Sequence, residues 1–387
     1  MFARVSTYGI AIAALLMTAC SQNETEMKTA SQEPVAISFS FTSTQDNQAT
    51  TRGEFTDTKL RSTGFGVFAT VEGSEIPNLM YNQQVTYTYL ADDDYLLDED
   101  GNLTSEAKNG YWSYSPTKYW PIQTVEKNGE LKTVPQTVTF CAYAPYVAAG
   151  GATGITGVSP NTEKPYLDYT LSEDLDETLD LLWTCYQPTA LGTIKFNMYH
   201  ALARVAVNVM LKNDNSYKTS TTKVLISEIT LKTTAENGAV KTGRLKLDDD
   251  NIVNVDDVAY PTWTTLTTGS RTVKIQNTDN SESYGIIAED VRYINDLPYS
   301  WQPEGLQKDG EGKGVLANAL CTANHPVAYV YFIPNNHGLT LSCTVYYTLM
   351  DNGGGIHNAH STKDVAITPL RGNRTYQLNL IIDPATP

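Results

Sequence analysis

Apolar and polar side chains alternate with a period of two residues along several short segments, and this spacing predicts half-buried β-strands. The clearest segment is 35–41, where Val35, Ile37, Phe39 and Phe41 alternate with small residues, mostly serine. All four apolar side chains are therefore expected on one face of a single strand. We call the segment 35–41 the leader strand.

Other segments are rich in the β-branched and aromatic residues that are typical of strands. Strands are predicted at 64–71, 84–90, 137–143, 194–211, 223–231, 328–333, 339–349 and 375–382. No long segment has the spacing of an amphipathic helix, and strands do not alternate with helices along the chain. The pattern predicts an all-β fold made of antiparallel β-sandwiches.

The first 20 residues have the pattern of a cleavable export signal. One basic residue, Arg4, precedes an apolar run at 8–17 that is too short to span a bilayer as a permanent helix. The run leads into Leu16-Met17-Thr18-Ala19-Cys20, with small residues directly before the cysteine. Residues 1–19 are therefore predicted to be a lipoprotein signal peptide, whose removal leaves Cys20 as the lipidated N-terminus. A methionine where leucine is usual leaves a plain secretory signal as the alternative.

The length of the chain predicts two domains. With 387 residues, the chain is longer than one ordinary hydrophobic core supports. After the signal peptide we expect a lipidated spacer and removable N-terminal strand at 20–52. An N-terminal β-sandwich domain is predicted at 53–190, and a C-terminal β-sandwich domain at 191–387.

Composition and charge restrict the partners. The formal net charge is −16, whereas nucleic acids and anionic lipid surfaces are bound by basic faces. We therefore expect no nucleic acid as a partner. The sequence after residue 19 contains no run that reads as a transmembrane helix, so membrane attachment is expected through the lipid on Cys20.

Four further cysteines, Cys141, Cys185, Cys321 and Cys343, divide two and two between the predicted domains. Export to an oxidising compartment permits disulfides. Buried free thiols and one bridge per domain, Cys141 with Cys185 and Cys321 with Cys343, are equally compatible with the sequence. The spacing is unlike that of zinc-binding cysteines.

No pattern of catalytic or metal-binding residues stands out. The most metal-like pair is His357 and His360, but it follows three glycines at 353–355 and is expected to lie in a solvated turn. The acidic stretch 98–101 lacks the first and last ligands of a calcium-binding loop. The chain also lacks a nucleophile elbow and a phosphate loop. We predict no enzymatic activity, no cofactor and no bound metal.

One aromatic group allows two interpretations. It consists of Tyr111, Trp112, Tyr114, Tyr119 and Trp120. Exposed clusters of flat aromatic faces mark binding sites and suit sugar rings. The same residues are also common in sandwich cores, where their polar tips find partners. Core packing is the favoured interpretation.

Several short motifs, taken in their order and spacing, resemble the fimbrillin family, the two-domain lipoprotein pilins of type V pili. Each motif is weak alone, but together they cover most of the chain. They are the signal ending at Cys20, Ile37-Ser38-Phe39 followed by Thr51-Arg52, Phe65-Gly66-Val67-Phe68-Ala69, Tyr119-Trp120-Pro121, Phe140-Cys141-Ala142-Tyr143-Ala144-Pro145-Tyr146, His200-Ala201-Leu202-Ala203-Arg204-Val205, Phe332-Ile333-Pro334 and Gly372-Asn373-Arg374-Thr375-Tyr376-Gln377-Leu378.

The resemblance implies two transthyretin-like β-sandwich domains and assembly of subunits by strand exchange. In this family an arginine-specific protease cuts behind an N-terminal strand, and the matching bond here joins Arg52 to Gly53. The implied partners are other pilin subunits, the protease, outer-membrane lipid through Cys20, and a host or bacterial surface receptor. The implied location is an outer-membrane lipoprotein precursor, with the mature form on a cell-surface pilus.

Strand exchange has a physical basis in the leader strand. Cleavage after Arg52 would separate this strand from the domain that it completes. Burial of its four large apolar side chains contributes about 6–12 kcal/mol, which is comparable with the net stability of a domain. Loss of the strand leaves an apolar groove with unpaired backbone groups, and a strand of another chain can fill such a groove.

The C-terminal strand is a candidate donor for this groove. Tyr376, Leu378, Leu380 and Ile382 share one face of it at a period of two residues. The same segment is equally well the last core strand of the second domain, since Pro384 soon follows and cannot donate to a ladder. In that case no spare donor remains, and a tip or accessory position suits the subunit better than the shaft.

The sequence is compatible with two functions. The main hypothesis is a structural subunit, shaft or tip, of a type V pilus that is exported as a lipoprotein and assembled by strand exchange. The alternative is a surface or tip adhesin that binds a glycan or a host protein and does not polymerise.

Overall fold

The computed structural model describes residues 34–42, 57–89, 110–148, 154–175, 177–211, 223–234, 238–248, 252, 260–276, 286–290, 293–295, 314–315, 328–335, 337–350 and 356–382. Within these residues the protein consists almost entirely of β-strands, with one short helix. The predicted all-β class is therefore confirmed. Cys20, Arg52, Gly53 and Cys321 lie outside the described residues.

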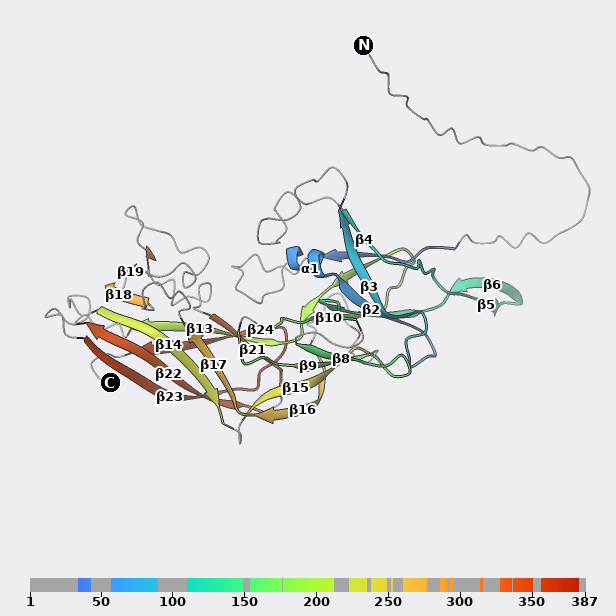
Figure 1. Cartoon of the computed structure of the whole chain (residues 1–387). Coiled ribbons are helices and arrows are strands. Elements are labelled where there is room, and N and C mark those ends of the chain that lie inside the picture. Colours follow the sequence, from blue (N-terminus) through green and yellow to red (C-terminus); the bar gives the residue numbers. More distant parts are fainter. Residues whose placement is uncertain are drawn as a thin grey trace, which may run out of the picture. The chain divides into compact units, whose positions relative to one another are not determined.

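A six-stranded antiparallel sheet is built mainly from the first half of the chain (Figure 1). Its central strands are buried on both faces, and this explains their nearly continuous apolar sequences. The order across the sheet is β12 (Tyr199–His200), β10 (Leu182–Tyr186), β7 (Val138–Ala144), β2 (Phe65–Val71), β3 (Met80–Tyr89) and β4 (Gly110–Ser113).

A helical turn precedes this sheet. Helix α1 (Asp57–Thr63) buries Leu60 and ends at Gly64, whose N–H donates to the Leu60 carbonyl at 2.8 Å. Gly64 has a φ of +68°, and an added Cβ would lie 2.4 Å from the Val85 carbonyl oxygen. Glycine is therefore required at this point for two reasons: the left-handed backbone and the close approach of β3.

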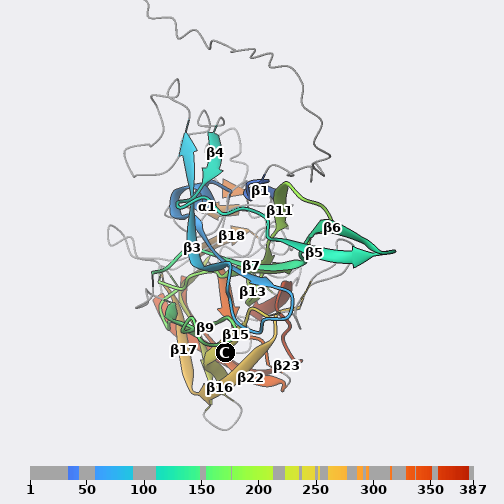
Figure 2. The same cartoon turned by 90° about the vertical axis from the view of Figure 1, so that its right-hand side faces the viewer.

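A separate two-stranded sheet contains the leader strand. Strand β1 (Ser38–Thr42) runs parallel to β11 (Thr193–Asn197), and the two lie side by side in Figure 2. Parallel neighbours need a long connection, and here the described strands β2 to β10 lie between them in sequence.

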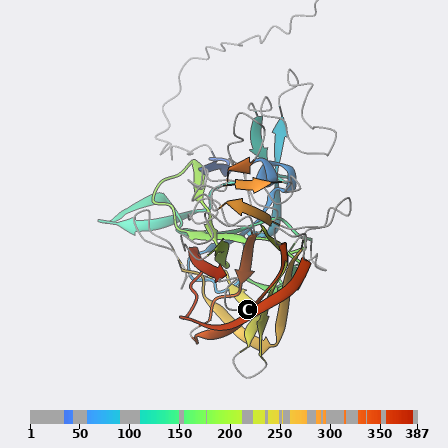
Figure 3. The same ribbon diagram turned by 90° about the vertical axis from the view of Figure 1, so that its left-hand side faces the viewer.

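Two further sheets are built from the second half. A seven-stranded sheet contains β14, β22 and β23, the longest described strands, which run side by side (Figures 1 and 3). A three-stranded sheet has β13 in its centre, antiparallel to β21 and parallel to β24. The bounds are β13 (Ala203–Leu211), β14 (Lys223–Thr233), β17 (Arg271–Gln276), β18 (Ile286–Asp290), β19 (Tyr293–Asn295), β20 (Gly314–Val315), β21 (Ala328–Phe332), β22 (Leu339–Met350), β23 (Ile356–Ile367) and β24 (Arg374–Ile382).

A four-stranded sheet crosses the predicted domain boundary at 190/191. Its order is β16 (Trp263–Gly269), β15 (Ala239–Lys246), β9 (Tyr166–Thr170) and β8 (Ile155–Val158), so strands of both halves pair with each other. One buried apolar cluster likewise combines residues of both halves, whereas two others are confined almost wholly to one half each. The boundary itself stays a prediction.

A polar hairpin projects from the sheets (Figure 2). Its strands are β5 (Ile122–Lys127) and β6 (Glu130–Pro135), and most of their side chains are exposed. The turn residues Asn128 and Gly129 both have positive φ, as a two-residue hairpin turn of type I′ requires.

A disulfide joins Cys141 to Cys185 across the six-stranded sheet. The two residues lie directly opposite each other in the ladder between β7 and β10. Cys343, in contrast, is a buried free thiol, and burial raises its pKa to about 11. The pairing of Cys141 with Cys185 agrees with the bridge predicted for the first half, whereas the free thiol of Cys343 does not agree with a bridge between Cys321 and Cys343.

Replacing both cysteines of this bridge, as Cys141→Ala with Cys185→Ala, should lower the free energy of unfolding by about 2–4 kcal/mol, because the unfolded chain loses a cross-link. Urea unfolding followed by tryptophan fluorescence measures the change. The matched control is a reducing agent, which should destabilise the wild type and leave the double variant unchanged. Equal sensitivity of both proteins to reduction would contradict the assignment.

A buried arginine connects three segments of the molecule. Arg271, at the start of β17, is 2% exposed, and its guanidinium donates to the Tyr331 carbonyl at 2.7 Å and to the Ser172 carbonyl at 2.8 Å. Its guanidinium also lies over the Phe332 ring. Burial lowers the pKa of Arg271 to about 10, so the group still carries its charge at neutral pH.

Candidate functional site: the leader strand and its cradle

The apolar face of the leader strand is buried. Ile37 is 2% exposed and Phe39 is 5% exposed, and Val35 and Phe41 pack partly buried against the same apolar cluster. The intervening residue Ser38 is exposed. The strand thus presents one apolar and one polar face, as the alternation in the sequence indicates.

Phe39 lies at the centre of an aromatic cluster. Its ring stacks on Phe196 with 5.5 Å between centroids and meets Phe65, Phe140 and Tyr114 at 6.1, 6.2 and 5.3 Å. Such aromatic pairs contribute beyond the area that they bury. The cradle of the leader strand is defined by these four rings, which come from β11, β2, β7 and the segment after β4.

The backbone of the leader strand pairs with two other segments. From Ser38 onward it forms the parallel ladder with β11. Just before, the Ile37 N–H donates to the Lys118 carbonyl, and the Trp120 N–H donates to the Val35 carbonyl, both at 2.9 Å. These bonds belong to an isolated antiparallel bridge between residues 36 and 119. The segment 118–120 therefore pairs with the start of the leader strand, before the ladder with β11 begins.

Side chains add two hydrogen bonds to this pairing. The Tyr114 hydroxyl donates to the Ile37 carbonyl at 2.8 Å, and the Ser38 and Thr193 hydroxyls bond each other at 2.7 Å. Burial raises the pKa of Tyr114 above its ordinary value, against the opposing effect of its bond with Lys118, so the phenol remains a donor at neutral pH.

The aromatic group of the sequence divides between core and surface. Trp120 is buried, and Trp112 packs against Phe65 and Tyr87 at 4.9 and 5.0 Å between centroids. Tyr111 and Tyr119 are 54% and 50% exposed. The favoured reading, core packing, thus describes the tryptophans and Tyr114, whereas two tyrosines face solvent.

The C-terminal strand is part of a sheet. β24 pairs in parallel with β13 over nine positions, from Arg374 beside Ala203 to Ile382 beside Leu211. Leu378 and Leu380 are 5% and 8% exposed. Tyr376 is partly buried, and its hydroxyl accepts the Arg371 N–H at 2.9 Å. Among the described strands, β24 has no ladder partner on its other side.

The prediction that His357 and His360 lie in a turn is wrong. His357 and His360 lie in β23 and not in a loop, and the His360 ring packs 5.7 Å from the Tyr346 ring. Residues three apart on a strand point to opposite faces, so they cannot share a metal ion. Within the described residues no group of three or more His, Cys, Asp or Glu is arranged to hold a metal. No helix of the described part is long and apolar enough to cross a membrane.

The sequence predicts the strands that contain Phe65, Phe140 and Phe196, but it does not predict that they pack against the leader strand. The period-two pattern of Ile194 and Phe196 in β11 is a readable strand signal, but a pattern does not show which strand lies beside which. A second feature also went unrecognised. A cavity is lined by residues of three separate segments at 260–266, 334–335 and 369–372, and nothing in the sequence brings those segments together.

These features define a class: an all-β protein whose first strand completes an aromatic core from outside the main sheets. A sequence model described as fimbrillin-like matches residues 51–386. Since this match covers most of the chain, the protein belongs to the fimbrillin-like family. The matched region begins after the leader strand.

The chain is also similar to two known proteins, one in sequence and one in fold. The chain is 28% identical over 269 residues to the fimbrium subunit Fim1C of Phocaeicola vulgatus, a match that covers 62% of this chain and 59% of the relative. The match thus spans about three fifths of that relative's length. The fold is similar to the crystal structure of a fimbrial protein from Bacteroides vulgatus, with a TM-score of 0.52, 19% identity, and coverage of 90% of this chain and 95% of the other.

Proposed function

We propose that the protein is a structural subunit of a cell-surface pilus, and that the leader strand holds the precursor in an unassembled state. The observation that carries the proposal is the burial of Ile37 and Phe39 in a cradle formed by later parts of the chain. A strand at the extreme end of a fold is the easiest one to remove by a single cut. Its removal would expose four aromatic rings and the edge of β11 to another subunit.

The proposed precursor is a lipoprotein. Cys20 carries the lipid and holds the chain at the outer membrane, and an arginine-specific protease cuts between Arg52 and Gly53. The family relationship supports other pilin subunits as partners, because fimbrial subunits associate with one another. The mature form then lies on the pilus at the cell surface.

The position of the subunit in the pilus depends on the C-terminal strand. In the structure Leu378 and Leu380 are buried in the core against β13, so use of this strand as a donor requires β24 to leave its sheet. This cost favours a tip or accessory position. A shaft position requires that the free energy gained when β24 fills the cradle of another subunit exceeds the free energy lost when its nine-residue ladder with β13 breaks.

The substitution Arg52→Ala should prevent assembly without unfolding the protein. Purified precursor is treated with an arginine-specific protease, and the products are followed by N-terminal sequencing and size-exclusion chromatography. The wild type should acquire Gly53 as its N-terminus and form oligomers, while the variant stays an intact monomer. Arg61→Ala, which changes an arginine of helix α1, serves as the matched control and should behave like the wild type.

A wild-type protein that is cut after Arg52 but remains monomeric, with the leader peptide still bound, would count against strand exchange. It would leave the second candidate, a surface adhesin that does not polymerise. That candidate is favoured by the firm pairing of β24 within its own sheet. Binding of host or bacterial cells to Tyr111→Ala and Tyr119→Ala variants tests it, because these two rings are exposed whereas Trp112 is packed inside.

A further inference from the structure

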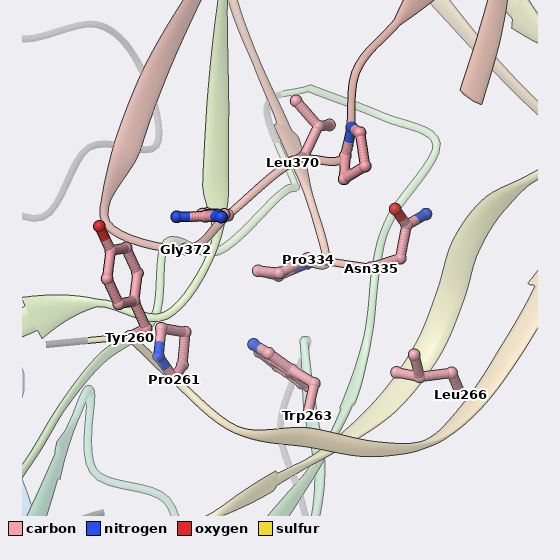
Figure 4. A pocket seen from close by; sticks show the side chains of 10 residues that line it. Tyr260, Pro261, Trp263, Leu266, Pro334, Asn335, Leu370 and Gly372 are labelled. Atoms are coloured by element: carbon pink, nitrogen blue, oxygen red, sulfur yellow. The ribbon is translucent and has the colours of Figure 1, made fainter. Parts of the chain in front are cut away.

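A cavity of about 410 Å³ is lined by residues of the second half of the chain (Figure 4). Its walls come from the residues before and within β16, the residues after β21, and the loop before β24. In Figure 4 Trp263 and Leu370 stand on opposite sides of the cavity, and Tyr260 and Asn335 stand at its two ends. The volume lies in the range of pockets that hold small molecules. None of the lining residues belongs to the cluster around the leader strand.

The walls of this cavity are held in place by the fold. The Trp263 indole N–H donates to the Ala201 carbonyl at 3.0 Å, and the indole packs edge-on against Tyr169. A Cβ added at Gly372 would lie 2.3 Å from the Pro261 ring, so the loop before β24 is pressed against the residues before β16. The cavity is therefore largely preformed, so ligand binding would lose little conformational entropy in ordering its walls.

The cavity carries positive charge on an acidic protein. The guanidinium carbons of Arg371 and Arg374 lie 5.6 and 5.9 Å from the centroid of the Tyr260 ring. Arg374 also donates to the Tyr260 hydroxyl at 3.1 Å, and this bond is the main reason why the pKa of Tyr260 is lowered. In the part of the chain that the structure describes, both guanidinium groups contact tyrosines and no carboxylate. They are thus available to an anion.

A buried acceptor lies at the opposite end. The Asn335 side-chain oxygen is buried, and the described residues give it no hydrogen-bond donor. A buried polar atom without a partner is costly, and a ligand hydroxyl would relieve that cost. The cavity therefore combines a cationic end, a flat aromatic wall and an acceptor that lacks a donor.

We propose that this cavity, the Tyr260–Arg371 pocket, binds an anionic sugar ring. A carboxylate or sulfate on the ring pairs with Arg371, the apolar face of the ring lies on Trp263, and a ring hydroxyl donates to Asn335. A sugar acid offers an anion, hydroxyl donors and an apolar face within a single ring. An acidic peptide matches the arginines but supplies no hydroxyl-rich ring for the aromatic wall and the acceptor.

Calorimetric titration of the purified, uncleaved protein with glucuronic acid, glucose 6-sulfate and glucose tests the proposal. At least one anionic sugar should bind roughly 10-fold or more tightly than glucose, because a charge-assisted hydrogen bond is the main difference between them. Binding of only one identifies whether the anion is a carboxylate or a sulfate. Equal affinity for all three sugars, no binding of any, or a preference for a triglutamate peptide would overturn the proposal.

The variant Arg371→Gln should weaken the anionic sugar roughly 10-fold and remove most of its salt dependence. Arg61→Gln is the matched control, because it makes the same change of charge and also removes a guanidinium from a tyrosine ring, that of Tyr87 at 4.9 Å. Arg371 has an exposed side chain, so the variant should keep its thermal stability. Unaltered sugar binding in Arg371→Gln would contradict the assignment. These measurements need no cleavage or polymer, so their result is independent of strand exchange.

Discussion

Replacing Phe39 by alanine is expected to lower the free energy of unfolding by about 3–5 kcal/mol, the range for deleting a well-buried phenylalanine. The ring is 5% exposed and contacts Phe65, Phe140, Phe196 and Tyr114. None of these four neighbours can close the space, because each is itself held in the core or bonded to the leader backbone. Urea unfolding of the uncleaved protein measures the loss.

The control for this experiment is Ser40→Ala on the same strand. Ser40 alternates with Phe39 and therefore points away from the aromatic cluster, so its change should stay within about 0.5 kcal/mol. A second measurement links stability to assembly. After cleavage behind Arg52, the leader peptide should dissociate faster from Phe39→Ala than from the wild type. A loss of less than about 1 kcal/mol for Phe39→Ala would show that the leader strand is held by its backbone bonds alone.

Replacing Arg271 by alanine is expected to lower the free energy of unfolding by about 2–6 kcal/mol, because two carbonyl groups, one buried and one partly buried, lose their donor. These carbonyls belong to Ser172, in the segment after β9, and to Tyr331 in β21. The guanidinium therefore binds a first-half segment to second-half strands. We expect the alanine variant to lose this connection before the individual sheets melt, which broadens the thermal transition seen by calorimetry.

Two further variants separate charge from hydrogen bonding at this position. Arg271→Met keeps most of the side-chain volume and removes both donors, so it should lose nearly as much stability as alanine. Arg271→Lys keeps the charge but reaches fewer carbonyls, so it should lie between methionine and the wild type. If methionine matches the wild type, the two carbonyl bonds contribute no net stability and the apolar contact with Phe332 is what matters.

Strands could be predicted from sequence where one face of the strand is apolar and the other is polar. Residues 35–41 and 375–382 alternate cleanly, and in the structure Ile37 and Leu378 lie on buried faces as the alternation indicates. Their roles as removable and donor strands stay predictions, because a burial pattern does not report which contacts are exchanged. β10, in contrast, has only five residues, almost all of them buried, so its sequence contains no alternation that would predict it.

The predicted strand at 194–211 is divided in the structure. It consists of β11, β12 and β13, with breaks near 198 and at 201–202. The Ala201 N–H donates to the Leu181 carbonyl, so the chain turns here from the six-stranded sheet to the three-stranded one. Apolar side chains continue through the turn because both sheets bury them. The sequence pattern therefore does not show that the chain passes from one sheet to the other.

A turn motif can be recognised in the sequence, whereas a pocket built from distant segments cannot. Asn128-Gly129 is a strong turn signal for the hairpin of β5 and β6. The flanking strands are mostly exposed and have no apolar face, so the sequence pattern does not predict them as strands. The Tyr260–Arg371 pocket had no signal of any kind. Its lining residues are up to about a hundred positions apart, and tertiary packing, such as that of Pro261 against Gly372, brings them together.

The parallel pairing of β1 with β11 fixes a direction. A strand that replaces β1 in the same ladder has to run parallel to β11. Its first residue would take the position of Ser38, opposite Thr193, and its last the position of Thr42, opposite Asn197. If a subunit donates a strand to this slot, the donor strand and the slot are different parts of the surface, unlike the single patch that two copies share when a two-fold axis relates them. Assembly by this contact would then be polar and open-ended, and the two ends of the fibre would differ chemically.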